Sequence, residues 1–131
     1  MLKRDEKESV LTAASFLEKN GYTMEKYDRD GIIYSDGERR IAIDFGRYGE
    51  SSSIAIHFVR ENNLFNLEWI ALVREGIKLI PGQTKNNLIA TLRYFEKNYR
   101  QVSNLDFCRE SDLMVKEYVK QNMPHLSLDA N

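Results

Sequence analysis

The stretch that decides the fold is GIIYSDGERRIAIDFGRYGESSSIAIHFVR, residues 31–60. It has the pattern of three β-strands, and alternate residues are apolar in the second and third of them, which is the period of a half-buried strand. Asp36-Gly37 separates the first two strands, and a longer loop at 46–52 with two glycines separates the next two. Both are typical of turns between antiparallel strands. The stretch therefore predicts an antiparallel meander.

The alternation divides the side chains of this meander between two faces. The apolar face is expected to carry Ile41, Ile43, Phe45, Ile54, Ile56 and Phe58. The other face is mixed and carries Arg40, Ala42, Asp44, Ala55, His57 and Val59. Because the core does not need the mixed face, we expect a function on that face and in the loops beside it.

Composition places the chain among ordinary globular domains. It has 131 residues, 42% of them hydrophobic and 30% charged, which is enough to form one buried core. We therefore expect a single domain over 1–131, with a loose tail at 124–131. Lys and Arg (19) nearly balance Asp and Glu (20), for a net charge of −1. A nucleic-acid partner is not expected, because the field that attracts phosphates is missing.

The sequence also predicts a compartment. Cys108 is the only cysteine, so an intramolecular disulfide is impossible, and residues 1–9 are charged where a secretion signal is apolar. No apolar run reaches the ~20 residues that a membrane helix needs. We expect a cytoplasmic protein with no membrane partner.

Outside the meander, the first segments predict a helix and an additional strand. Apolar residues at helical spacing indicate an amphipathic helix over 6–20, ended by Gly21. Residues 22–27 can form a first strand. The turn at 28–31 is expected to be closed by Gly31 at positive φ, as the Asp36-Gly37 turn is by Gly37.

Residues 64–74 fit two structures. Asn66 can cap a helix that Gly76 ends, but apolar residues also alternate here as in a strand, with a turn at 61–63. We favour the strand, because Trp69 suits a sheet.

Two helices are expected in the C-terminal part. One runs from a cap at Thr84 to about residue 101 and the other over about 106–123, where Pro124 stops it. The predicted fold is thus α+β: an N-terminal helix, an antiparallel meander of three to four strands, and two C-terminal helices packed on one face of the sheet.

The motifs of several enzyme classes are missing. The sequence has no phosphate-binding glycine loop, no Gly-x-Gly-x-x-Gly, no His-Glu-x-x-His and no Cys-x-x-Cys. With one cysteine and two histidines, a zinc site would need mostly carboxylates. We predict no cofactor, no metal site and no catalytic residue.

Two pairs of residues could still carry chemistry. A Cys108–His57 pair could form a nucleophile, but Cys108 falls on an apolar helical stripe, where a buried structural role is favoured. Asp44 and His57 share the mixed face and could meet as a cross-strand acid–base pair. The favoured interpretation of that pair is a surface ion pair beside Arg40.

The succession of residues from 53 to 118 resembles a family. The runs that carry the resemblance are Ile54-Ala55-Ile56-His57-Phe58, Phe65-Asn66-Leu67-Glu68-Trp69-Ile70-Ala71-Leu72-Val73-Arg74, Asn98-Tyr99 and Cys108-Arg109-Glu110-Ser111-Asp112. They resemble small uncharacterised proteins of Gram-positive bacteria that look like immunity partners of polymorphic or contact-dependent toxins. The resemblance implies a cytoplasmic protein without catalysis that binds and blocks one cognate toxin domain.

The expected interface combines the turns with the mixed face, since Tyr, Arg and complementary charge favour protein recognition. Its candidate residues are Asp28, Asp30, Asp36, Glu38, Arg40, Asp44, Arg47, Tyr48, Glu50 and His57. Whether the acids imitate nucleic acid stays open, because arginines nearly balance them. A small enzyme that uses Asp44 and His57, and a self-associating structural or regulatory domain, are the alternatives.

Overall fold

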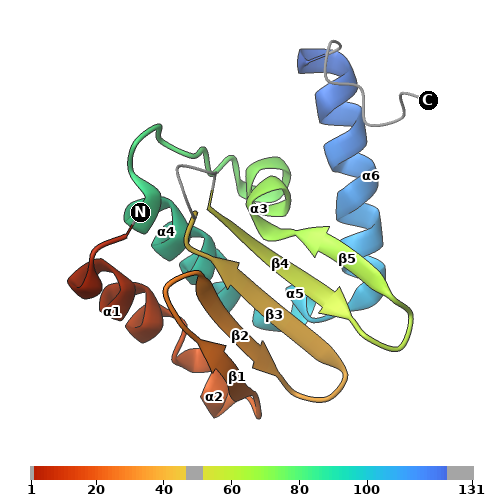
Figure 1. The fold of residues 1–131 in the computed structure, drawn as a ribbon. Helices are drawn as coiled ribbons and strands as arrows, with labels where there is room; N and C mark the ends of the chain where they lie inside the picture. The colour runs from red at the N-terminus through yellow and green to blue at the C-terminus, as the bar shows by residue number, and fades with distance from the viewer. Residues whose placement is uncertain (1, 47–51, 124–131) are drawn as a thin grey trace.

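The computed structural model describes residues 2–46 and 52–123. It consists of five strands in one sheet and helices at both ends of the chain (Figure 1). The elements are α1 (Arg4–Ala13), α2 (Phe16–Lys19), β1 (Thr23–Tyr27), β2 (Gly31–Ser35), β3 (Arg39–Asp44), β4 (Ser53–Phe58), β5 (Asn63–Asn66), α3 (Leu67–Glu75), α4 (Thr84–Lys97), α5 (Tyr99–Val102) and α6 (Leu105–Asn122). The predicted α+β architecture is confirmed.

The sheet is an antiparallel meander in the order β1-β2-β3-β4-β5. The sheet has five strands where the predicted fold had three to four, and the segments at its two edges are β1 and β5. The predicted apolar face is buried: Ile41, Ile43, Ile54 and Ile56 are at most 1% exposed. Figure 1 shows α4 and α5 behind this face, α1 beside the sheet at the left, and α3 and α6 at the β5 side. Among the described elements, no helix crosses the near face of the sheet.

The N-terminal helix predicted over 6–20 is two helices instead of one. The break lies at residues 14–15, where tighter backbone bonds occur, such as Leu17 N–H to the Ala14 carbonyl at 3.0 Å. The adjacent Phe16 and Leu17 that follow the break both face the core, at 5% and 0% exposed. Gly21 follows with φ +90°, as expected of a residue that ends a helix.

Gly31 does not have the predicted positive φ, whereas Gly37 does, at +93°. Gly31 is needed for another reason. A Cβ placed on it would lie 2.1 Å from the Ile43 carbonyl oxygen on β3. The β1–β2 turn needs no left-handed glycine, because Asp28 Oδ1 accepts from the Asp30 N–H at 2.8 Å and the Gly31 N–H at 3.2 Å.

Residues 64–74 contain both of the structures that their pattern allows, so the preference for a strand was wrong for most of them. The strand ends at Asn66, whose side chain accepts a hydrogen bond from the Trp69 N–H at 3.0 Å and caps α3. Gly76 ends that helix at φ +68°. The turn before β5 lies where it was predicted, with Asn62 at φ 54°.

The C-terminal helices match the prediction apart from their ends. The first ends at Lys97 rather than near 101, and Gln83, not Thr84, is its N-cap residue. A short helix, α5, then precedes α6, which the Asn104 side chain caps by accepting from the Phe107 N–H at 3.0 Å. The buried stripe of α6 is Cys108, Ser111, Val115 and Val119. None of the helices in the described part combines the length and apolar character needed to cross a membrane.

Candidate functional site

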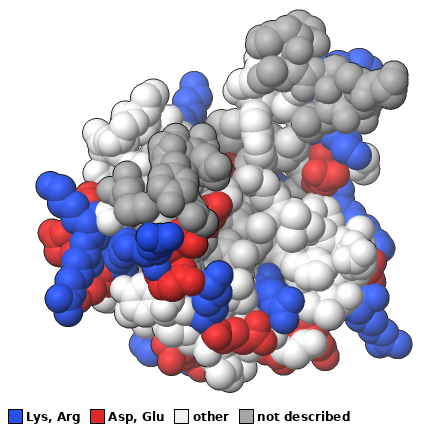
Figure 2. Space-filling model, in the orientation of Figure 1, with Lys and Arg blue, Asp and Glu red and all other residues white. Residues whose placement is uncertain are grey.

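The near face of the sheet, here called the open face, is not covered by any of the described helices (Figure 1). Its middle is one row of neighbours in register, in which Ile33 lies opposite Ala42 and Ala42 opposite Ala55. These three residues are partly exposed. In Figure 2 uncharged residues occupy the middle of this face, and Lys, Arg, Asp and Glu lie at its left side and along its lower edge. The three small or apolar residues are called the central row below.

A second row of the open face carries polar side chains that bind one another. Arg40 lies opposite His57, and His57 lies opposite Leu64, which is 68% exposed. Arg40 Nε donates to Glu25 Oε1 at 3.1 Å, and His57 Nε2 lies 2.9 Å from Asn62 Oδ1. An irregularity between Met24 and Lys26 in β1 accounts for the position of Glu25, since a bulge re-aims side chains.

Asp44 and His57 do not form the predicted cross-strand pair. They lie on the same face of adjacent strands, as the alternation predicted. However, Asp44 is opposite Ser53 and His57 is opposite Arg40, so four residues of strand separate their rows. At ~3.4 Å per residue this is beyond hydrogen-bond reach. Asp44 Oδ1 instead accepts from the Gly46 N–H at 2.8 Å.

The acids of the two predicted turns lie at opposite ends of the sheet. Asp28 and Asp30 belong to the β1–β2 turn, at the end where Asp44 also lies. Asp30 and Asp44 line one shallow hollow of about 280 Å³ together with Lys26 and the central-row residues Ile33 and Ala42. Hydrogen bonds from the Asp30 backbone N–H, then the Lys26 ammonium, hold the pKa of Asp28 below its usual value. One end of the open face therefore gathers three acids, of which Asp28 pairs with Lys26 at 3.4 Å and Asp30 with Arg29 at 3.9 Å.

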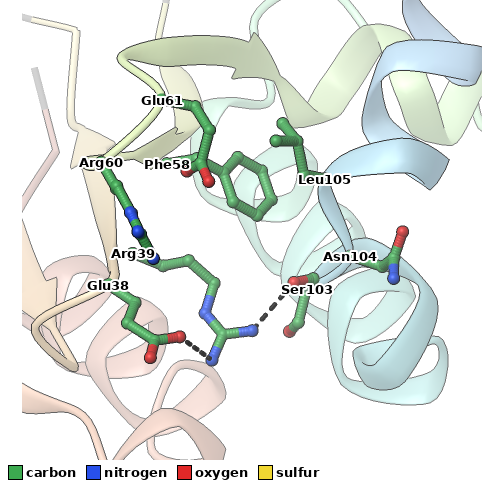
Figure 3. A pocket seen from close by; sticks show the side chains of 8 residues that line it. All are labelled: Glu38, Arg39, Phe58, Arg60, Glu61, Ser103, Asn104 and Leu105. Carbon is green, nitrogen blue, oxygen red and sulfur yellow. Dashed lines mark hydrogen bonds and ion pairs between the residues drawn. The ribbon is translucent and has the colours of Figure 1, made fainter.

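Glu38 lines a different groove, of about 290 Å³, between the β2–β3 turn and the start of α6 (Figure 3). Arg39 joins its two sides, since Nη1 donates to the Ser103 carbonyl at 2.8 Å and Nη2 to Asp36 Oδ2 at 2.8 Å. Partial burial alone would raise the pKa of Asp36. Hydrogen bonds from the Arg39 and Glu38 N–H groups and from the Arg39 side chain have the larger combined effect, so the pKa of Asp36 is lowered. Asp36 is thus a structural residue, whereas the Glu38 side chain is 86% exposed.

Three of the candidate interface residues, Arg47, Tyr48 and Glu50, lie outside the described residues. The structure therefore brings together Arg40 with His57, and Asp30 with Asp44. It places Asp36 and Glu38 at the far end of the sheet from Asp44.

The Cys108–His57 nucleophilic pair is excluded by position. Cys108 is fully buried among the helices, and its thiol donates to the Val102 carbonyl at 3.1 Å. Burial raises the pKa of this thiol to about 12, which is the opposite of what a reactive thiolate needs. His57 lies on the other side of the sheet.

The sequence analysis missed Glu68, a buried carboxylate at one corner of the sheet. It lies in the first turn of α3, is 7% exposed, and its Oε1 accepts from the Ile54 N–H at 2.8 Å. It lines a cavity of about 520 Å³ together with Trp69, Lys78 and Tyr118. Burial, reinforced by the nearby Asp44 carboxylate, raises the pKa of Glu68 to about 7. The alternative prediction of a helix from Asn66 to Gly76 would have placed Glu68 in the first turn of that helix.

Glu68 should make stability depend on pH. Its folded pKa lies above the unfolded value of 4.5, so the folded state holds its proton longer and stability falls as pH rises between the two values. We therefore compare the free energy of unfolding of Glu68→Gln with that of the wild type at two pH values. The difference should shift in favour of the variant by ~2–3 kcal/mol from about pH 5 to about pH 8. Urea unfolding at both pH values measures the gain. Glu110→Gln, an exposed change on α6, should show no such trend, and a Glu68→Gln difference independent of pH would contradict the assignment.

Among the described residues, no group of three or more His, Cys, Asp or Glu side chains is placed to hold a metal ion. Comparison with protein-family models, with curated proteins and with solved structures finds no match to this chain.

Proposed function

We propose that the chain is a non-catalytic binding protein of the immunity class, which binds a cognate toxin domain through the open face and neutralises it. The observation that carries the proposal is the central row, Ile33, Ala42 and Ala55, on a face that the described helices leave uncovered. Its three apolar side chains are partly exposed, and another folded domain can pack against them.

The charges around the central row indicate the chemistry of the partner. Arg40 is bound to Glu25, and Asp36 is bound to Arg39. The acids also divide between two ends of the sheet. A surface of this kind does not imitate the continuous negative charge of a nucleic acid. We therefore infer that the partner presents a mainly uncharged patch with a polar rim, as non-obligate protein interfaces do.

Co-expression with the toxin encoded beside this gene tests the proposal. We expect the chain to restore growth and to co-purify with the toxin domain. Ala55→Arg places a charge in the central row and should weaken the complex by ~100-fold or more, equivalent to ~3 kcal/mol, as measured by calorimetry. Glu96→Arg, an exposed change on α4 behind the sheet, is the matched control and should bind normally.

Several outcomes contradict the proposal. It fails if no neighbouring gene product is toxic, or if the chain neither rescues growth nor co-purifies. It also fails if Ala55→Arg remains folded and binds as tightly as Glu96→Arg. Light scattering of the isolated chain distinguishes self-association, because a stable dimer that Ala55→Arg dissociates would assign the open face to a second copy of the chain.

A further inference from the structure

The cavity at Glu68 has the size and lining of a small-molecule site. It is an open pocket of about 520 Å³ at the corner where β4, the first turn of α3 and the C-terminal part of α6 meet, and its volume lies in the range of ligand pockets, ~300–1,000 Å³. Apolar side chains of Leu72, Ile77 and Leu79 line it beside the aromatic rings of Trp69 and Tyr118. Glu68 adds a buried acid to this apolar lining.

We propose that this cavity binds a small organic cation, a protonated amine attached to an apolar body. The Glu68 carboxylate is the counter-ion of the ammonium group, and the apolar and aromatic walls enclose the rest of the molecule. This inference concerns a different surface from the open face and does not depend on the toxin partner.

The geometry of Glu68 leaves room for an ammonium donor. Its side chain lines the cavity, and the hydrogen bond from the Ile54 N–H occupies one position on Oε1. A carboxylate has about four such positions. Glu68 also lies at the N-terminal end of α3, whose dipole favours the ionised carboxylate. An ionised acid at 7% exposure is costly without a cation, and a bound amine supplies one.

The other charged groups around the cavity also favour a cation over an anion. On β3, Asp44 is close enough to Glu68 to raise its pKa, so it adds negative potential. Lys78, in the segment after α3, also lines the cavity and is an exposed residue. An anionic ligand would meet the buried Glu68 carboxylate, whereas a neutral one would supply no counter-ion for its charge.

The aromatic rings of the lining would contact the apolar body of the ligand. The ring centroids of Trp69 and Tyr118 are 6.3 Å apart, with their planes at 62°. Rings of this kind attract cations within ~6 Å of a ring centroid, and they also bury apolar groups. One helix supplies the acid and the Trp69 ring, and a second helix supplies Tyr118.

Titration of the full chain with 2-phenylethylamine, followed by NMR chemical shifts, tests the proposal. 2-Phenylethanol, which has the same ring and no charge, is the matched ligand. We expect the amine to bind at least ~10-fold more tightly than the alcohol, with shifts centred on Glu68, Trp69 and Tyr118. Glu68→Gln should abolish the preference, because Gln keeps an oxygen acceptor for the Ile54 N–H but loses the charge. Glu110→Gln should preserve it.

The wild type offers a second measurement that needs no variant. The amine should bind ~10-fold more weakly at about pH 6 than at about pH 8, because Glu68 becomes protonated over this range while the amine stays charged. The proposal is overturned if the amine and the alcohol bind equally, if neither binds, if the shifts lie elsewhere, or if Glu68→Gln retains the preference. A negative result with the amine would leave the toxin-binding proposal unaffected, since that proposal is tested by binding of the toxin domain to the open face.

Discussion

Gly31→Ala is expected to destabilise the protein by more than ~3 kcal/mol, because the new methyl group meets backbone rather than a movable side chain. Its Cβ would lie 2.1 Å from the Ile43 carbonyl oxygen and 3.1 Å from the carbonyl carbon. Relief of that contact requires β2 and β3 to separate where Gly31 pairs with Asp44. Equilibrium unfolding in urea measures the loss, and the NMR shifts of residues 41–45 should move with it.

Gly21→Ala is the matched control for this prediction. Gly21 has φ +90°, and a Cβ added to it would have nothing within 4 Å, so alanine there is opposed by backbone strain alone, ~1–2 kcal/mol. If the two substitutions cost the same, close approach of the strands is not the reason for glycine at position 31.

Phe95→Ala should have a comparable effect, a loss of ~3–5 kcal/mol. Phe95 lies on α4 and is 0% exposed. Its ring stacks on Tyr99, with centroids 5.7 Å apart, and meets Phe16 edge to face at 5.3 Å. The substitution therefore removes the ring that joins α2, α4 and α5, and it leaves a cavity that these helices cannot readily fill. The same urea experiment measures it.

Leu113→Ala provides the comparison, since Leu113 lies on α6 and is 66% exposed. This substitution should lower the free energy of unfolding by less than ~0.5 kcal/mol. A loss at Phe95 as small as that at Leu113 would mean that the aromatic contacts between α2, α4 and α5 do not contribute to the core.

The parts of the fold that depend on local pattern could be predicted from the sequence. Alternation correctly identified the buried residues of β3 and β4 and the face on which Asp44 and His57 lie. It could not say which residues lie opposite one another, because register depends on where the loop between the strands ends. The Asp44–His57 pair was wrong for that reason.

Other parts required information that no local pattern contains. Asn66 ends a strand and begins a helix, so two periodicities overlap in one short segment. Interpreting that segment as one element hid Glu68, whose burial results from the packing of α3 on β4. Gly31 was correctly assigned to a turn region, but its role depends on the Ile43 backbone, which lies on another strand.

The most direct test of the central claim, that the open face binds the partner, is an NMR comparison of the isotope-labelled chain with and without the unlabelled toxin domain. We expect the largest shift changes at Ile33, Ala42 and Ala55 on β2, β3 and β4, and little change in α1 and α4, which lie away from this face. Changes confined to those helices, with the central row unaffected, would contradict it.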